Sequence, residues 1–499
     1  MRIFALPPPI RRLHALFARL LVAVALIMLL AMQGRALLLF FQHAQLALDF
    51  PYTLNYGEGP LLEQAVRLAR GENIYRADLT TPPYTIANYP PLYPLVQAPF
   101  VAAVGPAFWY GRLISVFSIL AAALFLGLTV RAITRDALAA LVAALTLPAI
   151  PYVFSWSALA RIDSLALACA WAGIFAVVQG RGRRWGVIAG VILLACAAYT
   201  RQTYLLAAPL AAVAWLWGEK ERTKALMLGV YFAALVLGVF AGLTALTGGG
   251  VFFHLITANV NALDPQLPEF YWNEMLAHLP IFLAAAALAL VLGVVFGRRV
   301  WWLSAPYTLG AVVTALTISK VGSDVNYLYE LAAAFALAAG AWIAWTRRLP
   351  VLRALLLLVL AYAVSMAYDL SLSKYQPILT ERVDDAPLMT ELIAFIDQTD
   401  APIIADEHMA LLTLAARPIL IQPFEMSQLA AAGIWDETPF LEDLQSGVYP
   451  YVLIYQPYRN PSLRFERWTR PMLREINEHY RPLLQTAETT VYQYFRADH

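Results

Sequence analysis

The 499-residue chain is 61% hydrophobic and only 14% charged, a composition that excludes an ordinary soluble domain and predicts a polytopic membrane protein. Its formal net charge of +2 gives no reason to expect a nucleic-acid partner. The two cysteines, Cys169 and Cys196, lie inside apolar stretches, so the sequence indicates neither a disulfide framework nor a thiolate metal site.

Hydropathy predicts about eleven membrane-spanning helices, because a crossing helix needs roughly 20 mostly apolar residues. The first is interpreted as an uncleaved span, since basic residues precede it and no small-residue cleavage site follows it. The predicted limits are 14–40, 106–130, 137–154, 160–179, 185–199, 203–217, 225–246, 276–296, 300–318, 327–346 and 350–370.

Basic residues gather in alternate turns of the chain, for example Arg131 with Arg135 and Arg298 with Arg299. By the positive-inside rule, these turns and the basic N-terminus are cytoplasmic. The first loop, residues 49–105, is then expected outside, together with residues 247–275 and everything after about 371. The fifth and sixth spans are too short to cross easily, so the turn between them is expected to be recessed, which in membrane proteins often marks a binding site.

The first loop is the first long polar interval after a hydrophobic span. It holds the isolated carboxylates Asp49 and Glu58, and then a short amphipathic helix that Gly59 and Pro60 begin and Gly71 ends. Such a helix is expected to lie flat on a membrane or on other helices. Glu58 at its entrance suits either simple helix capping or a chemical role, and the residues leave both open.

Ionisable residues at the outer ends of spans are the other candidates, because they are costly in hydrocarbon. A carboxylate beside cations could take a proton from an acceptor hydroxyl while Arg or Lys stabilises a departing phosphate. The set therefore predicts group transfer from a lipid phosphate, although interfacial snorkelling of Arg161 and Lys320, or helix capping by Asp324, would explain part of it. Its members are Arg161, Asp163, Arg201, Lys320, Asp324, Asn326 and Glu330.

Residues 375–499 predict a small soluble α/β domain, separate from a membrane domain of residues 1–374. The adjacent Asp406, Glu407 and His408 look like a metal cluster. Consecutive helical residues point in different directions, however, so capping of a short helix is the favoured interpretation. The segments expected to be helical are 388–396 and 471–479, and those expected to be extended are 402–405, 418–422 and 450–455.

The chain resembles the polytopic C-type glycosyltransferases, which include protein O-mannosyltransferases, the aminoarabinose transferases of lipid A and polyprenyl-phosphate-mannose dependent mannosyltransferases. The resemblance rests on one span, a long outer loop with an acidic residue before an amphipathic helix, Gly71 and Tyr75 at the helix end, and the run Pro90-Pro91-Leu92. It implies an α-helical polytopic membrane fold with a cytoplasmic N-terminus. It also implies inverting transfer of a sugar from a polyprenyl-phosphate carrier at the outer face of the cell membrane.

By this resemblance the family's first-loop acidic residue corresponds to Glu58, with Asp49 as second choice, and the family's usual Asp-Glu pair is here Gly57-Glu58. Some relatives carry Lys before the double proline, where this chain has Tyr89, so the donor phosphate is expected to bind cations from elsewhere. The expected catalytic residues are Glu58 and Asp49, and the expected substrate-binding residues are Arg201, Lys320, Arg161, Asp163, Tyr89, Tyr93, Asp324, Asn326, Tyr327, Glu330 and His254.

The expected partners are a polyprenyl-phosphate sugar donor, a lipid, glycan or protein acceptor, and the bilayer, with no nucleic acid. A multi-pass transporter or lipid flippase is the alternative, and the lack of two matching halves in the sequence argues against it. A non-catalytic assembly factor is a third interpretation. The residues leave open the sugar, the acceptor and any need for a divalent metal.

Overall fold

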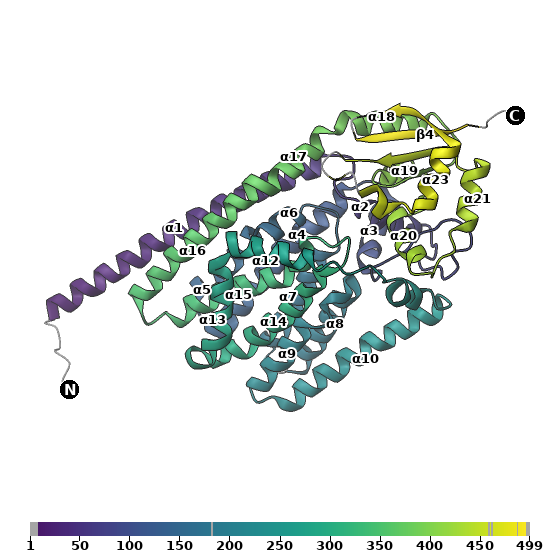
Figure 1. Cartoon of the computed structure of the whole chain (residues 1–499). Coiled ribbons are helices and arrows are strands. Elements are labelled where there is room, and N and C mark those ends of the chain that lie inside the picture. The colour runs from purple at the N-terminus through teal and green to yellow at the C-terminus, as the bar shows by residue number, and fades with distance from the viewer. Residues whose placement is uncertain (1–7, 181–182, 458–459, 461–462, 487, 496–499) are drawn as a thin grey trace.

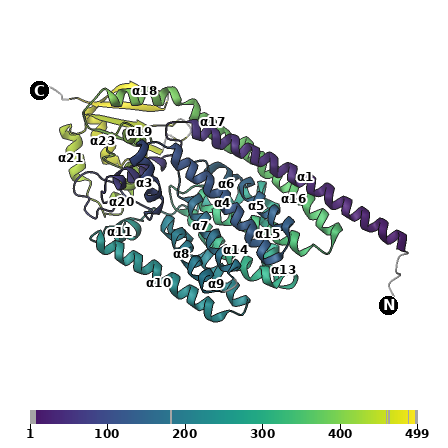
Figure 2. The same cartoon turned by 180° about the vertical axis from the view of Figure 1, so that it is seen from behind.

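The structure is a computed structural model that describes residues 8–180, 183–457, 460, 463–486 and 488–495, with side chains from Leu16 onward. A bundle of helices makes up most of the molecule, and a small domain with a four-stranded sheet sits at one end of it (Figure 1). Figure 2 shows the same arrangement from behind. The chain is therefore predominantly helical, as its composition predicts.

Each apolar segment predicted as a span falls on helix in the structure. Within the described residues, six helices are long and apolar enough to cross a membrane, or up to seven if the bent pair α12 (Gln266–His278) and α13 counts as one. The number is below eleven because others, such as α7 and α8 with 17 residues each, are shorter than the length of about 20 that a crossing needs. The helices are α1 (Pro8–Asp49), α4 (Trp109–Thr134), α5 (Ala137–Thr146), α6 (Pro151–Trp156), α7 (Asp163–Gln179), α8 (Arg184–Thr200), α9 (Ala207–Gly218), α10 (Arg222–Leu246), α13 (Pro280–Phe296), α14 (Arg298–Leu316), α15 (Tyr329–Trp345) and α16 (Pro350–Leu370).

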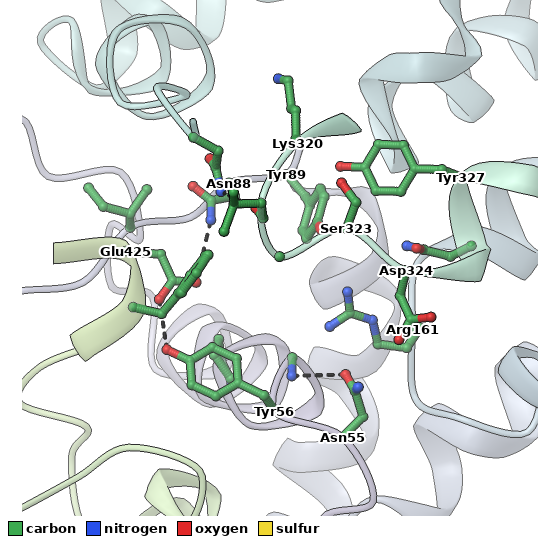
Figure 3. Close-up of a pocket in the computed structure, with 18 of the residues that line it drawn as sticks. Asn55, Tyr56, Asn88, Tyr89, Arg161, Lys320, Ser323, Asp324, Tyr327 and Glu425 are labelled. Atoms are coloured by element: carbon green, nitrogen blue, oxygen red, sulfur yellow. Dashed lines mark hydrogen bonds between the residues drawn. The ribbon is translucent and has the colours of Figure 1, made fainter. Parts of the chain in front are cut away.

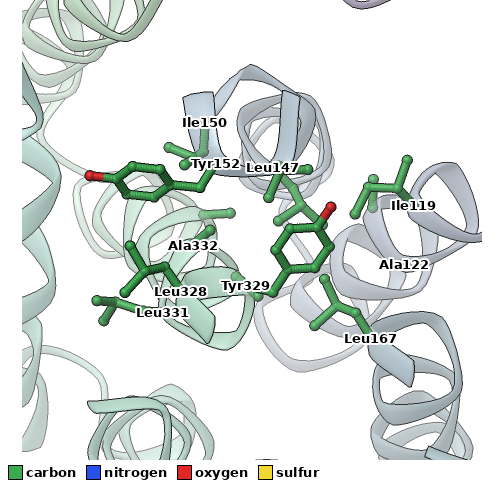
Figure 4. Packing of buried hydrophobic residues seen from close by; sticks show 14 of the residues in the cluster. Ile119, Ala122, Leu147, Ile150, Tyr152, Leu167, Leu328, Tyr329, Leu331 and Ala332 are labelled. Atoms are coloured by element: carbon green, nitrogen blue, oxygen red, sulfur yellow. The ribbon is translucent and has the colours of Figure 1, made fainter. Parts of the chain in front are cut away.

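The core of the bundle lies between α4, α5, α7 and α15, whose inward side chains are fully buried (Figure 4). Ile119, Leu167 and Tyr329 meet there. Small residues let the helices approach closely: a Cβ at Gly340 of α15 would lie 2.8 Å from the Cβ of Ala143 in α5. This tight packing fixes the helix ends on which the site is built.

The last helix of the bundle runs on without a break into the C-terminal domain. After α16 the helix continues through η6 (Ser371–Tyr375) and α17 (Gln376–Asp384), so that residues 350–384 form one helical run beside α1 (Figure 1). The domain boundary predicted after residue 374 therefore falls inside this run. The fold of the C-terminal domain begins at α18 (Ala386–Asp397).

The C-terminal domain contains one mixed sheet in the order β1-β2-β4-β3, with β1 parallel to β2 and the other pairs antiparallel. The predicted extended segment 418–422 does not join this sheet. Ile421 instead forms an isolated bridge with Tyr84 of the first loop. The elements after α18 are β1 (Ile403–Ala405), α19 (Met409–Leu414), α20 (Pro423–Ala431), α21 (Thr438–Ser446), β2 (Tyr451–Tyr455), α22 (Leu463–Arg467), α23 (Arg470–His479), β3 (Tyr480–Gln485) and β4 (Thr489–Tyr494).

The first loop is enclosed between the bundle and the C-terminal domain. It contains α2 (Glu58–Ala69) and α3 (Leu92–Val104), and α2 packs between α3 and α19. The fit to α19 is close, because a Cβ at Gly59 would lie 2.9 Å from the Cβ of Ala410. The amphipathic helix expected from the sequence thus lies against other helices.

The segments predicted to be on the outer side do share one end of the bundle. The backbone of Tyr84 exchanges hydrogen bonds with Leu420 and Gln422 at 2.8 and 2.9 Å. His254, in η3 (Phe253–Thr257) of the second such segment, accepts a hydrogen bond from Ala87 at 2.9 Å. The side of the membrane on which this end lies stays a prediction.

Candidate functional site

A polar cavity of about 300 Å³ lies where the first loop, the ends of the bundle helices and the C-terminal domain meet (Figure 3). Its lining includes η2 (Gln202–Leu205), which is the recessed turn expected between the two short spans, and the segment from η4 (Thr317–Ser319) to η5 (Val325–Leu328). Amide side chains are frequent in it and suit a ligand with many hydroxyl groups. They are Asn55, Gln64, Asn88, Gln202, Asn259, Asn261 and Asn326.

Arg161 is a cation on this cavity that forms no ion pair within the described part of the chain. Its side chain is buried, with 7% of the residue exposed, and its Nε has no hydrogen-bond partner. The guanidinium lies over the rings of Trp156 and Tyr89, at 5.3 and 5.9 Å from their centroids, and none of the carboxylates that the structure describes forms an ion pair with it. Because a buried, unpaired charge is costly, an anion bound in the cavity next to this side chain would be stabilised.

Lys320 is the second cation on the cavity. Its Nζ donates a hydrogen bond to Oδ1 of Asn259 at 2.9 Å, and its backbone forms an isolated bridge with Leu263. Figure 3 shows Arg161 and Lys320 on different sides of Tyr89. Both side chains line the cavity.

Arg201 lies outside the cavity, contrary to its expected role as a phosphate-binding cation. Its Nη1 bonds to Oδ1 of Asp163 and donates to the carbonyl of Asn326 at 2.9 Å, and its guanidinium covers the ring of Tyr327 at 4.3 Å. Asp163 also accepts from Nε1 of Trp156 at 2.8 Å and from Nδ2 of Asn326 at 3.2 Å. The pair therefore positions Asn326 and Tyr327, which do line the cavity.

Glu58, expected to be the catalytic base, does not line the cavity either. It is fully buried, and Arg112 donates to both carboxylate oxygens at 3.0 and 2.9 Å. The amides of Leu54 and Ala160 donate at 2.7 Å each. Burial disfavours the charged form, but the Arg112 charge and these donors together hold the pKa of Glu58 below its ordinary value. Because both of its oxygens accept hydrogen bonds from these donors, the Glu58 carboxylate anchors the start of α2.

Four other predicted residues lie away from the cavity. Asp49 is exposed at the end of α1, and Glu330 is buried in α15. Tyr93 donates to the carbonyl of Gly111 at 2.9 Å in a packed region. His254 accepts from Ala87 through Nδ1, so its Nε2 donates to the carbonyl of Arg76 at 2.7 Å. Tyr93 and His254 therefore hold the first loop in place.

Part of the predicted substrate-binding set does line the cavity, namely Tyr89, Arg161, Lys320, Asp324, Asn326 and Tyr327. It also includes residues that the sequence interpretation missed, among them Tyr56, Glu425 and Arg467. Oε2 of Glu425 accepts a hydrogen bond from the Tyr56 hydroxyl at 2.8 Å, and Nδ2 of Asn88 approaches Oε1 at 3.5 Å. The available sequence signal for Glu425, an acidic residue in a first helical turn, is typical of simple capping.

Asp406, Glu407 and His408 diverge, as their consecutive positions predict. Asp406 accepts from Nε1 of Trp468 at 3.0 Å, and Nε2 of His408 contacts the hydroxyl of Thr489 at 2.9 Å. Glu407 pairs with Arg467 and with Arg382. This network holds Arg467, whose guanidinium lies 4.9 Å from the centroid of the Tyr56 ring at the cavity wall.

No protein-family model matches the chain, and no curated protein matches its sequence. The fold, in contrast, has clear relatives among solved structures. ArnT from Cupriavidus metallidurans bound to undecaprenyl phosphate superimposes with a TM-score of 0.61 and 15% identity over 94% of this chain and 98% of that chain. Its apo state gives a TM-score of 0.56 and 15% identity over 93% and 97% of the two chains.

The Archaeoglobus fulgidus oligosaccharyltransferase in complex with Zn and sulfate gives a TM-score of 0.50 and 11% identity over 91% of this chain and 73% of that chain. These likenesses show that the chain shares its fold with ArnT and with this oligosaccharyltransferase, as the resemblance seen in the sequence predicts. At this level of identity they concern the fold, and the functional argument returns to the residues of the cavity.

Proposed function

We propose that this protein is a membrane glycosyltransferase that takes a sugar from a polyprenyl-phosphate carrier and transfers it to a hydroxyl group of a lipid, glycan or protein acceptor. The observation that carries the proposal is Arg161, a buried cation that forms no ion pair with any described carboxylate, on a polar cavity that Lys320 also lines. The fold shared with ArnT, solved with undecaprenyl phosphate, supports this class of carrier.

In the proposed reaction, the acceptor oxygen attacks the anomeric carbon of the sugar while the bond from that carbon to the phosphate oxygen breaks. Arg161 and Lys320 stabilise the charge that develops on the departing phosphate, an interaction that strengthens in the transition state. The amide side chains of the cavity hydrogen-bond the sugar hydroxyls. One displacement on one face of the sugar inverts its configuration.

We place the reaction on the extracytoplasmic side of the cell membrane. The basic turns lie at the end of the bundle away from the cavity, where, for example, Arg299 pairs with Glu219 and Arg353 pairs with Asp136. By the positive-inside rule that end is cytoplasmic. The C-terminal domain and the cavity would then face outward, at the depth of a lipid headgroup.

Removing either cavity cation is expected to weaken the binding of undecaprenyl phosphate by about one to two orders of magnitude, because hydrogen bonds to charged groups contribute about 1.5–3 kcal/mol each. The variants are Arg161→Ala and Lys320→Ala, measured in detergent by displacement of a fluorescent lipid phosphate. Arg347→Ala is the control, since this arginine is exposed in the turn after α15.

Equal affinity of all three variants for undecaprenyl phosphate would contradict the assignment of Arg161 and Lys320 to the phosphate site. A wild-type protein that binds no undecaprenyl phosphate, or that moves a lipid across vesicles without forming a glycosidic product, would contradict the proposed function itself.

A further inference from the structure

The proposed transfer requires a group that takes the proton from the acceptor hydroxyl, and the first loop does not supply it. None of its five carboxylates lines the cavity; they are Asp49, Glu58, Glu63, Glu72 and Asp78. Gly57, the neighbour of Glu58, lines the cavity but has no side chain. A Cβ at this position would lie only 1.3 Å from Nη1 of Arg161, so the guanidinium fills the place where a side chain of residue 57 would begin.

Three described carboxylates line the cavity: Asp324, Glu425 and Glu466. Asp324 lies on the same side of the cavity as Arg161 (Figure 3), and its Oδ1 accepts from the amide of Val325 at 2.7 Å and from the hydroxyl of Tyr271 at 3.2 Å. Glu466, in the short helix α22, has no hydrogen bond that would orient it in the described part of the chain. A general base must be positioned within reach of the proton that it removes.

Glu425 has both the position and the fixed orientation that a general base requires. It lies in the first turn of α20, where Pro423 occupies an early helical position, and the Tyr56 hydroxyl fixes one of its oxygens. The other oxygen has only the long contact of 3.5 Å with Asn88. Figure 3 shows Glu425 on the opposite side of the cavity from Arg161, which leaves room for the reacting groups between the base and the phosphate-binding cation.

The surroundings of Glu425 also suit proton transfer near neutral pH. Burial raises the pKa of its carboxyl to about 7, although the Tyr56 hydrogen bond and the nearby charges of Arg467 and Arg161 oppose the increase. Among the described residues, these three side chains affect its charge most strongly, and Lys320, Asp324 and Glu466 are the other charged side chains on the same cavity. Burial raises the pKa of Tyr56 well above its ordinary value, so the Tyr56 hydroxyl does not change charge near pH 7.

We propose that Glu425 of the C-terminal domain is the catalytic base of the transfer, an inference that rests on the proposed function. Its carboxylate takes the proton of the acceptor hydroxyl as the acceptor oxygen forms its bond to the anomeric carbon. The bond between that carbon and the phosphate oxygen breaks, and the polyprenyl phosphate leaves with the electron pair. The C-terminal domain thus completes the active site instead of only shaping its entrance.

Glu425→Gln is expected to lower kcat by a factor on the order of 10² to 10⁴, the usual contribution of a positioned base. The assay measures release of undecaprenyl phosphate from a panel of undecaprenyl-phosphate-linked hexoses and pentoses, with membrane lipids as acceptors. Glu442→Gln makes the same charge change on the exposed face of α21 and is expected to retain wild-type activity.

The binding of undecaprenyl phosphate gives a second measurement that needs no turnover. Glu425→Gln is expected to bind this lipid at least as tightly as the wild type, because the substitution removes a negative charge facing the phosphate. A loss of affinity of tenfold or more would show that Glu425 supports the donor site and would overturn the role of base.

The pH dependence of kcat/KM provides a readout that a purely structural role would not change. A base must be deprotonated to act, so activity is expected to rise with pH through a midpoint near 7 in the wild type. Tyr56→Phe removes a hydrogen bond that stabilises the carboxylate, which raises the pKa of Glu425 and moves the midpoint to higher pH. Glu425→Gln should abolish this limb of the profile.

The outcomes separate the two proposals. Full activity and an unchanged pH profile in Glu425→Gln, in an enzyme that still uses a polyprenyl-phosphate donor, would overturn the role of Glu425 and leave the proposed function standing. A large loss in Glu466→Gln with none in Glu425→Gln would assign the base to α22 instead. A wild-type protein with no affinity for undecaprenyl phosphate would overturn the proposed function.

Discussion

Arg112→Met is expected to destabilise the folded protein by about 3–5 kcal/mol, because it leaves the carboxylate of Glu58 buried without its counter-ion. The substitution also removes hydrogen bonds outside this ion pair. The Arg112 guanidinium also donates to the carbonyls of Ala47, Phe50 and Tyr52, and so it ties the end of α1 to the first loop. Reversible unfolding in mixed micelles measures the effect.

Arg131→Met is the matched control, since it makes the same change on the exposed face of the same helix, α4. We expect the double variant Glu58→Leu/Arg112→Met to be more stable than Arg112→Met alone, because no uncompensated charge remains. Equal stability of Arg112→Met and the control would show that the pair does not anchor the loop.

Asp163→Asn is expected to destabilise the bundle by a comparable amount, about 3–5 kcal/mol, because Arg201 would keep its charge in a buried site without a carboxylate. The substitution should also alter the cavity wall, since Arg201 contacts the carbonyl of Asn326 and the ring of Tyr327. We therefore expect a lower unfolding midpoint together with weaker binding of undecaprenyl phosphate.

Asp369→Asn is the control for this prediction, because it removes a carboxylate from an exposed position on α16. Normal stability and normal lipid binding in Asp163→Asn would contradict the positioning role assigned to the pair.

The helices of the bundle could be predicted from the sequence because hydropathy is a local signal. Even the short α2 lies within about two residues of the limits expected from Gly59, Pro60 and Gly71, because these residues mark helix ends by ordinary backbone preferences. Strand β3 could not be predicted in this way. It is an edge strand with a proline, Pro482, and mostly exposed side chains, so it lacks the alternation that identifies a half-buried strand.

The site could be predicted only in part, because the sequence shows which charges are isolated but not which charges meet. Arg112 and Glu58 are 54 positions apart, and Arg201 and Asp163 are 38 apart. Glu58 and Arg201 are predicted as functional because their charges are isolated in the sequence, and in the structure each charge is paired. Arg161 lies on the cavity because it comes just before α7, and none of the carboxylates in the described part of the chain forms an ion pair with it.

The bridge between Tyr84 and Ile421 joins segments separated by most of the chain. A ribosome must therefore synthesise nearly the whole polypeptide before the cavity wall can close around α2. Partly made chains would hold the cavity cations Arg161 and Lys320 but lack Phe424 and Glu425. Under the proposed function such chains should be inactive, and late completion of the site would prevent them from consuming the lipid-linked donor.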